Sequence, residues 1–218
     1  MKKIFLSLAI ISFSFSANAQ VMSFSENSQI AFRKSPEFND ATTAGSKYFN
    51  EQFTLAKVNK GTQDFQIRYN GFTDAMEYKN GKDILELIKE QNTYFEFNNG
   101  EVYELFNYDD RDTNVSRYHQ ILVKSENIKV SKYKSIKLNP FTKASNSYET
   151  DKQANYKPNK DAYFVTYNNQ TIEFDGKAKD LEKLIPGKTS EIKQYFKSTK
   201  VKENDTDMIK LGQFLSTL

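Results

Sequence analysis

The chain has 218 residues, a formal net charge of +3, 18 Phe and 13 Tyr, and neither Cys nor Trp. The missing cysteines exclude disulfides, thiolate nucleophiles, Cys-ligated metal sites and a lipid-modified N-terminal cysteine. The nearly balanced charge excludes a strongly basic nucleic-acid-binding protein, and the small numbers of Gly (8) and Pro (4) exclude a collagen-like or disordered chain.

The N-terminus has the layout of a secretory signal peptide. Residues 1–3 carry two lysines, residues 4–15 are mostly apolar, and small residues precede the end of the segment at Ala19. The apolar run is shorter than the ~20 residues that a membrane-spanning helix needs. We therefore expect cleavage between Ala19 and Gln20 and export to the periplasm or the exterior, without a lipid anchor or a later membrane span. The mature chain would carry a net charge of +1, because residues 1–19 hold two lysines and no acidic residue.

Short runs of alternating apolar and polar residues follow one another between residues 45 and 176, which is typical of antiparallel strands. The clearest hairpin joins residues 93–97 to 101–105 through Asn98-Asn99-Gly100, because Asn and Gly accept the positive φ of tight turns. The preceding segment, residues 20–44, is rich in Ser and Asn and predicts irregular structure with at most one short strand. Other strands are expected at residues 64–69, 75–79, 84–88, 118–124, 128–138, 163–167 and 171–174, and polar loops at 107–116 and 139–161.

The apolar period changes to that of a helix near residue 177. Up to three short amphipathic helices are expected from there to residue 218, the last capped by Asn204 or Asp205. Strands followed by helices predict a single α+β domain over residues 45–218, with a curved or partly closed antiparallel sheet of roughly eight to ten strands and two or three C-terminal helices. The predicted core consists of Phe65, Ile67, Tyr69, Phe95, Phe97, Val102, Ile121 and Phe174.

Three groups of residues carry a resemblance to known proteins. They are Gly45-Ser46-x-Tyr48-Phe49-Asn50-Glu51-x-Phe53, then Arg68-Tyr69-Asn70 with Asp74-x-Met76-Glu77, and last residues 177–185 with Glu191-Ile192-x-x-Tyr195-Phe196-Lys197. Together with a signal that ends in Asn-Ala-Gln, they resemble small secreted proteins of unknown function from flavobacteria and their relatives. The resemblance spans most of residues 45–215 and implies a β-rich fold with C-terminal helices and an exported protein. It implies no activity.

The single histidine, His119, alternates with Ile121 and Val123, which places it in or beside the predicted core. One interpretation is a general base. A structural histidine on a strand is favoured, because no Ser or Asp partner stands at the spacing of a catalytic triad and no nucleophile motif is present.

Acidic residues suggest a calcium loop at one place. Asp110-x-Asp112-x-Asn114 begins like an EF-hand loop, but Val115 stands at the sixth position, where Gly is needed, and Ile121 at the twelfth, where a Glu belongs. A solvated acidic turn is therefore favoured, although a calcium site of another kind stays open.

Carboxylate pairs suggest a hydrolase. Glu96 lies across the predicted hairpin from Glu101 and Glu104, and glycoside hydrolysis uses two carboxyl groups. Such pairs are also ordinary on the exposed face of a hairpin, so no catalytic residue is assigned. No Gly-rich phosphate loop or dinucleotide motif predicts a cofactor, and one histidine excludes a multi-histidine metal centre.

Lysines are frequent between residues 124 and 143, interleaved with Tyr133 and Phe141. They are Lys124, Lys129, Lys132, Lys134, Lys137 and Lys143. They suit contact with anionic lipid headgroups, polysaccharide or nucleic acid. An edge strand that uses lysine against aggregation is favoured, because a mature net charge of +1 creates no overall attractive field. The sequence thus favours a non-catalytic envelope protein that binds a protein partner, a lipid or another apolar ligand on its curved sheet. A carboxylate-dependent, glycosidase-like hydrolase is the alternative.

Overall fold

The computed structural model describes residues 20–25, 28–38, 40, 42–89, 93–110, 113–146 and 148–218, with side chains from residue 31 onward. The predicted signal peptide, including Ala19, lies outside these residues, and Gln20 is the first residue of the first strand.

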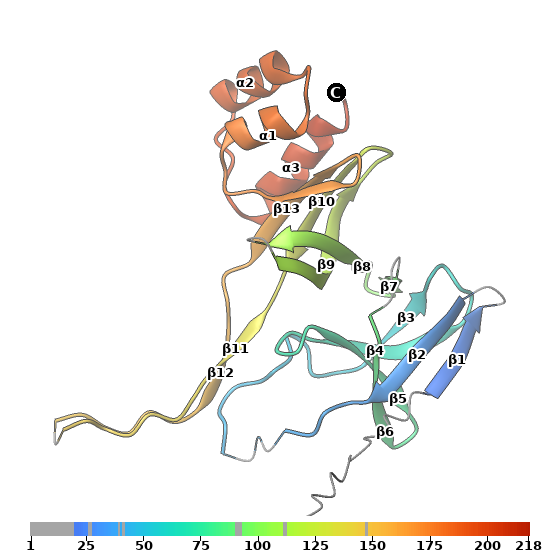
Figure 1. Ribbon diagram of the computed structural model, residues 1–218, viewed down its shortest axis with the longest axis vertical. Helices are drawn as coiled ribbons and strands as arrows, with labels where there is room; N and C mark the ends of the chain where they lie inside the picture. Colours follow the sequence, from blue (N-terminus) through green and yellow to red (C-terminus); the bar gives the residue numbers. More distant parts are fainter. Residues whose placement is uncertain are drawn as a thin grey trace, which may run out of the picture.

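The described residues form an α+β fold in which a curled antiparallel sheet precedes three C-terminal helices, as the sequence predicts (Figure 1). The sheet has twelve strands, more than expected, in the order β1-β2-β6-β5-β4-β3-β7-β8-β9-β10-β13-β14. These strands are β1 (Gln20–Ser25), β2 (Ser28–Lys34), β3 (Thr54–Val58), β4 (Asp64–Asn70), β5 (Ala75–Asn80), β6 (Asp83–Leu87), β7 (Tyr94–Phe97), β8 (Val102–Asp110), β9 (Thr113–Lys124), β10 (Ile128–Tyr133), β13 (Ala162–Tyr167) and β14 (Gln170–Glu173).

The N-terminal segment 20–44 differs from the prediction of irregular structure with at most one short strand, because it contains two paired strands, β1 and β2. Strand β2 also pairs with β6, which brings Phe32 opposite Leu87. Both side chains are buried. Burial of this apolar pair holds the segment on the sheet, although its Ser- and Asn-rich sequence shows no clear alternation.

The predicted polar loop at residues 107–116 is mostly strand as well. Strands β8 and β9 stay paired out to Asp110 and Thr113. The ring of Tyr108 is buried and lies 5.1 Å, centroid to centroid, from the ring of Phe164. This aromatic contact extends the hairpin through a stretch whose other residues, apart from Val115, are polar.

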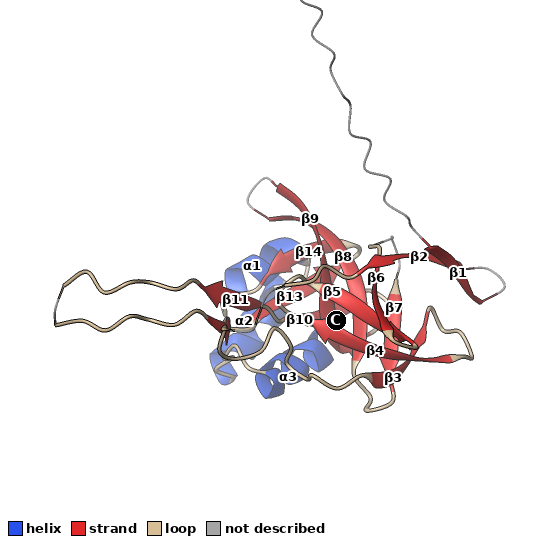
Figure 2. Ribbon diagram, turned by 90° about the horizontal axis from the view of Figure 1, so that it is seen from below, coloured by secondary structure: helices blue, strands red, loops and turns tan. Residues whose placement is uncertain are grey.

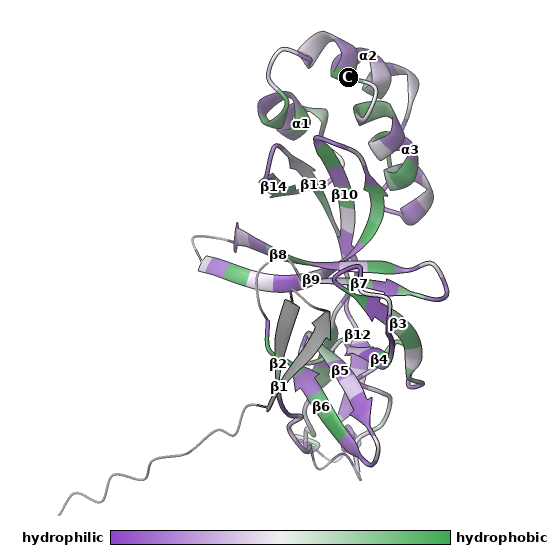
Figure 3. Ribbon diagram, turned by 90° about the vertical axis from the view of Figure 1, so that its right-hand side faces the viewer, coloured by the Kyte–Doolittle hydropathy of each residue, from purple (hydrophilic) through white to green (hydrophobic). Residues whose placement is uncertain are grey.

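Three clusters of buried side chains fill the fold. The first lies along β3–β7 and includes Phe65 and Phe95, the second joins the helices to β10 and β13 through Val130 and Leu211, and the third surrounds Phe164 inside the curl. Figure 3 shows the helices at the β10–β13–β14 end and β3–β6 at the other, with β8 and β9 between them. Six of the eight predicted core residues are buried, whereas Val102 and Ile121 are half-buried.

A bulge in β9 changes which face its residues occupy. The pairing of β9 with β10 shifts between Val130↔Val123 and Ser131↔Ile121, so Leu122 is an extra residue. As a result Val123 packs with the helix cluster, while Ile121 packs inside the curl with Phe164. The prediction that His119 lies on the same face as Val123 is therefore wrong, because the bulge moves Val123 to the helix side.

The helices are α1 (Ala178–Leu184), α2 (Thr189–Ser198) and α3 (Asp205–Leu215). Asn204 caps α3, as predicted, by accepting a hydrogen bond from the backbone N–H of Asp207. A Cβ added to Gly212 would lie 2.8 Å from Val130 and 2.9 Å from Val123. Helix α3 therefore sits directly on β9 and β10 because this position lacks a side chain.

A long hairpin, residues 136–158, projects from the rest of the fold (Figure 2). We call this hairpin the arm and the rest of the described chain the body. The base of the arm is the two-stranded sheet of β11 (Ile136–Asn139) and β12 (Asn155–Pro158), and residues 140–154 form the rest of the arm. The arm is anchored where Tyr156 N donates to Ala44 O (2.8 Å) and Ile136 N donates to Gly71 O (2.8 Å). Most of the loop predicted at residues 139–161 belongs to this arm.

Candidate functional site

The arm exposes apolar side chains that nothing in the described chain covers. Leu138 is 39% exposed, Phe141 51% and Tyr148 100%. Three of the seven large apolar side chains that are exposed among the described residues lie on this one hairpin. Exposed apolar groups gathered on a projecting element mark an interaction site more often than isolated ones do.

The arm is also basic. Its four lysines are all exposed, and none forms an ion pair with a residue that the structure describes. They are Lys137, Lys143, Lys152 and Lys157. Lys137 and Lys157 stand directly opposite each other in the β11–β12 ladder. Like charges at opposed positions of a hairpin are destabilising, so this pair favours an anion beside it.

The two acidic residues of the arm are engaged in its own turn. Asp151 Oδ1 accepts a hydrogen bond from Ala144 N at 2.8 Å. Glu149 Oε2 accepts one from Ser145 Oγ at 2.8 Å, and hydrogen bonds from Ser145 lower the pKa of Glu149. These carboxylates therefore stabilise the turn and do not pair with the lysines of the arm.

The structure divides the lysines that the sequence suggested as one anionic-surface site. Lys124 and Lys129 both bind the carboxylate of Glu104. Although burial raises the pKa of Glu104, hydrogen bonds from the two lysines lower it overall. Lys132 is buried and binds Asp205 at the start of α3 at 2.7 Å. These three lysines are therefore engaged in ion pairs within the protein, Lys132 in its interior and Lys124 and Lys129 nearer the surface.

The remaining members of that lysine group are available. Lys137 and Lys143 lie on the arm. Lys134 lies between β10 and β11 at the base of the arm, where its Nζ is 4.3 Å from the centroid of the Phe49 ring. No carboxylate of the described residues lies within ion-pair distance of Lys134.

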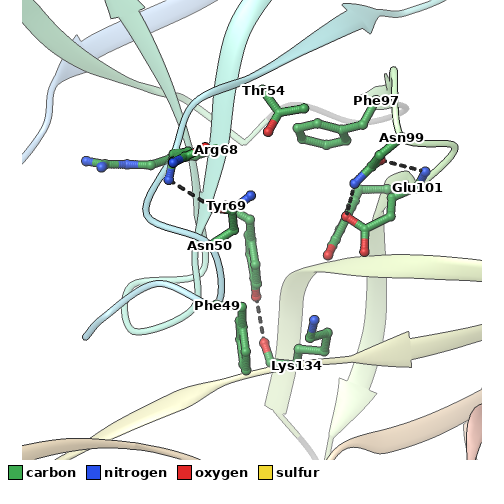
Figure 4. Close-up of a pocket in the computed structure, with 11 residues that line it drawn as sticks. Phe49, Asn50, Thr54, Arg68, Tyr69, Phe97, Asn99, Glu101 and Lys134 are labelled. Carbon is green, nitrogen blue, oxygen red and sulfur yellow. Dashed lines mark hydrogen bonds between the residues drawn. The ribbon is translucent and has the colours of Figure 1, made fainter. Parts of the chain in front are cut away.

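A hollow of about 210 Å³ opens beside Lys134 (Figure 4). Its apolar wall consists of Phe49, Tyr69, Phe97 and Tyr103. Its polar rim consists of Asn50, Gln52, Thr54, Arg68, Asn99, Glu101 and Lys134. Four segments meet there: the loop before β3 with Thr54, strand β4, the β7–β8 hairpin and the link to the arm.

A buried polar cluster supports one side of the hollow. Glu77 is 1% exposed and accepts hydrogen bonds from Arg68 (2.7 Å), from Asn70 Nδ2 (2.8 Å) and from Tyr48 Oη (3.1 Å). Arg68 also donates to Glu51 O (2.9 Å). Because its charge is matched by Glu77, Arg68 is a structural member of the rim rather than a free cation.

A second buried network lies behind the aromatic wall. Tyr69 Oη is 2.8 Å from Asp74 Oδ1 and 2.8 Å from Lys134 O. Asp74 also binds Lys89 and accepts from Tyr118 N. Burial raises the pKa of Asp74 and of Tyr69. The network therefore fixes the orientation of Tyr69 and the backbone at Lys134.

His119 is fully buried between aromatic rings, 4.5 Å from Phe164 and 4.7 Å from Phe106, centroid to centroid. Its Nδ1 is 3.1 Å from Ser131 Oγ, and its Nε2 has no partner among the described residues. Burial, aided by the charge of Arg117, lowers the pKa of His119 to about 3. A neutral, enclosed imidazole without a carboxylate partner supports the structural interpretation over the general base.

The acidic candidates are dispersed. Asp110 pairs with Arg117 at 3.0 Å, and Asp112 of the suggested calcium loop lies outside the described residues. Glu104 is held by lysines, while Glu101 faces the hollow. Among the described residues, no three His, Cys, Asp or Glu side chains are grouped so that they could hold a metal ion.

No protein-family model, curated protein or solved structure matches the chain. Within the described part of the chain, no helix has the length and apolar character needed to cross a membrane.

Sequence reasoning did not find the hollow, because its residues come from segments up to 85 positions apart, as Phe49 and Lys134 are. One signal was present. The motif residues Arg68-Tyr69-Asn70, Asp74 and Glu77, quoted above only for a resemblance, form the two buried networks that support the hollow.

Proposed function

We propose that the protein is an exported, non-catalytic binding protein of the cell envelope that contacts an anionic lipid surface through the arm. The observation that carries this proposal is the projecting arm, where unpaired lysines and exposed aromatic rings lie together. Export rests on the signal-peptide pattern of residues 1–19.

The charge of the arm suits anionic headgroups. It holds four lysines against two acidic residues that its own turn engages, so its surface charge is positive. A lysine close to an anionic membrane contributes about 1 kcal/mol of binding free energy. An anion between Lys137 and Lys157 would also relieve the repulsion between them.

The apolar side chains supply the second part of the contact. Phe141 and Tyr148 can enter the boundary between headgroups and acyl chains while the lysine ammonium groups stay among the headgroups. Stable attachment to a membrane generally needs two such signals, and the arm carries both on one hairpin.

The other candidate functions find less support. The inside of the curl is filled by the protein's own side chains, among them Phe106, His119 and Phe164, which argues against a carrier of large apolar ligands. A glycosidase needs two carboxyl groups at its site, and Glu101 is the one acidic residue among the described residues that line the hollow.

The test is sedimentation of the mature protein with vesicles at low salt. Wild type should bind vesicles of phosphatidylglycerol and phosphatidylcholine, and bind phosphatidylcholine alone far less. Lys137→Gln/Lys157→Gln should weaken binding by roughly 30-fold, since two lysines at ~1 kcal/mol each are removed. Phe141→Ser/Tyr148→Ser should weaken it as well.

The matched control is Lys79→Gln/Lys82→Gln, which removes the same charge from exposed positions at the β5–β6 turn. It should bind like wild type. Equal binding of both vesicle types by wild type, or equal loss in the control and the arm variant, would contradict the proposal. A dimer seen by sedimentation and abolished by the arm variants would instead assign the arm to a second copy of the chain.

A further inference from the structure

We infer that the hollow beside Lys134 binds one small zwitterion, an α-amino acid or a dipeptide, with its ammonium at Glu101 and its carboxylate at Lys134. This inference goes beyond the membrane contact and does not depend on it.

Two unmatched charges of opposite sign lie on the rim of the hollow. Arg68 is matched by Glu77, so Lys134 is the one cation of the rim without a carboxylate partner among the described residues. Glu101 forms no ion pair with a described residue either. A ligand that carries both charges would complement this pair.

The Glu101 carboxylate and the Lys134 ammonium are both held in place. Glu101 accepts hydrogen bonds from Asn99 Nδ2 and from Gln120 Nε2, each at 3.2 Å. These neutral amide donors orient the carboxylate, leave its charge unmatched and leave further lone pairs for an ammonium. Lys134 is held over the ring of Phe49 (4.3 Å). Such preorganisation reduces the entropy lost on binding.

The shape of the hollow also suits a small ligand. Tyr103 packs against Tyr69 and Phe97, with ring centroids 5.5 and 5.7 Å apart, so the wall is rigid and apolar. In Figure 4, Glu101 and Asn99 lie on one side of the space and Asn50 on the other, with Lys134 below. The volume of about 210 Å³ is below that of sites for drug-sized ligands, which fits a single residue.

The experiment is isothermal titration calorimetry of the mature protein with four probes: leucine, N-acetyl-leucine, leucinamide and the dipeptide Leu-Leu. N-acetyl-leucine lacks the ammonium, and leucinamide lacks the carboxylate. Leucine should bind saturably, and each truncated probe should bind about tenfold or more weakly, because a charge-assisted hydrogen bond is lost. Tighter binding of Leu-Leu than of leucine would assign the site to dipeptides, and the reverse to free amino acids.

Two variants make the assignment specific to atoms. Glu101→Gln should abolish the preference for leucine over N-acetyl-leucine and keep the preference for leucine over leucinamide. Lys134→Gln should abolish the preference for leucine over leucinamide and keep the preference for leucine over N-acetyl-leucine. Glu126→Gln and Lys79→Gln, at exposed positions, are the matched controls, and urea unfolding checks that each variant is folded.

No saturable heat with leucine or with Leu-Leu would overturn the inference. The same holds if both variants bind all probes as wild type does, or if each loses both preferences while remaining folded. Vesicle binding by the arm would stand in every one of these cases, because none of these substitutions lies on the arm.

Discussion

The body and the arm use the same residue types in opposite ways. In the body, Glu77 is surrounded by three kinds of donor, and Arg68 is matched by that one carboxylate. On the arm, Lys137 and Lys157 face each other with no carboxylate of the described residues beside them. Charges that are matched inside a fold stabilise its conformation, whereas unmatched, exposed charges remain available to a partner. The arm therefore exposes charge that the described chain does not match, whereas the cluster around Glu77 in the body holds matched charge.

The apolar side chains repeat this contrast. Tyr69 is buried in the wall of the hollow and bound to Asp74, while Tyr148 on the arm is fully exposed. The Tyr69 side chain therefore contributes to stability through packing and a hydrogen bond, and the Tyr148 side chain contributes through neither. Substitutions in the two regions should accordingly differ in what they change.

The largest expected effect is on the matched charges of the body. Glu77→Ala would leave the Arg68 guanidinium largely buried without its carboxylate, which should lower the free energy of unfolding by about 3–5 kcal/mol. Urea unfolding followed by circular dichroism measures this loss. The double variant Arg68→Met/Glu77→Leu should recover only part of it, since an apolar pair replaces the ion pair while Asn70 and Tyr48 still lack their acceptor.

A matched control for this prediction is Glu126→Ala, at an exposed position between β9 and β10. Its stability should stay within about 0.5 kcal/mol of wild type. If Glu77→Ala behaved like the control, the polar cluster would not be a stabilising element, and the contrast between body and arm would disappear.

His119 offers an intermediate effect that depends on pH. Its pKa is about 3 in the folded protein and 6.5 ordinarily, so below pH 6.5 the unfolded chain binds a proton that the folded protein does not. Stability should therefore fall as the pH drops from 6.5 toward 3. Between pH 8 and pH 5, wild type should lose about 2 kcal/mol more than His119→Gln, which lacks the titrating group.

Urea unfolding of both proteins at pH 8 and pH 5 measures this difference. NMR gives an independent readout, because His119 is the one histidine of the sequence and its imidazole signals are unambiguous. Those signals should not shift between pH 8 and pH 5. A titration near pH 6.5 would show that the His119 imidazole is accessible to water. The interior of the body would then hold a protonated histidine, which burial argues against.

The smallest expected effect is on the stability of the arm variants. Phe141→Ser/Tyr148→Ser removes two exposed rings, and should change the free energy of unfolding by no more than about 0.5 kcal/mol while vesicle binding falls. The measurement is urea unfolding beside the sedimentation assay. A loss of several kcal/mol would mean that these two rings pack against another part of the folded protein. The arm would then contribute to stability as the body does.

Much of the fold could be predicted because its signals are local. Alternation identified the hairpin at β7 and β8, and the change to a helical period placed the three helices, with Asn204 as a cap. The sequence did not locate strand β2, because residues 28–34 show no clear alternation. Their strand conformation depends on long-range pairing with β6, in which Phe32 lies opposite Leu87. The bulge at Leu122, which separates Ile121 from Val123, likewise depends on the neighbouring strand.

The sequence by itself determined the α+β class and the pattern of an export signal, because composition and periodicity are properties of neighbouring residues. Tertiary structure alone decided which of six similar lysines are available. Lys124, Lys129 and Lys132 meet carboxylates that lie up to 73 positions away, while Lys134, Lys137 and Lys143 do not. Charge pairing depends on distance in space, which no local pattern records, and the hollow and the arm owe their unmatched charges to it.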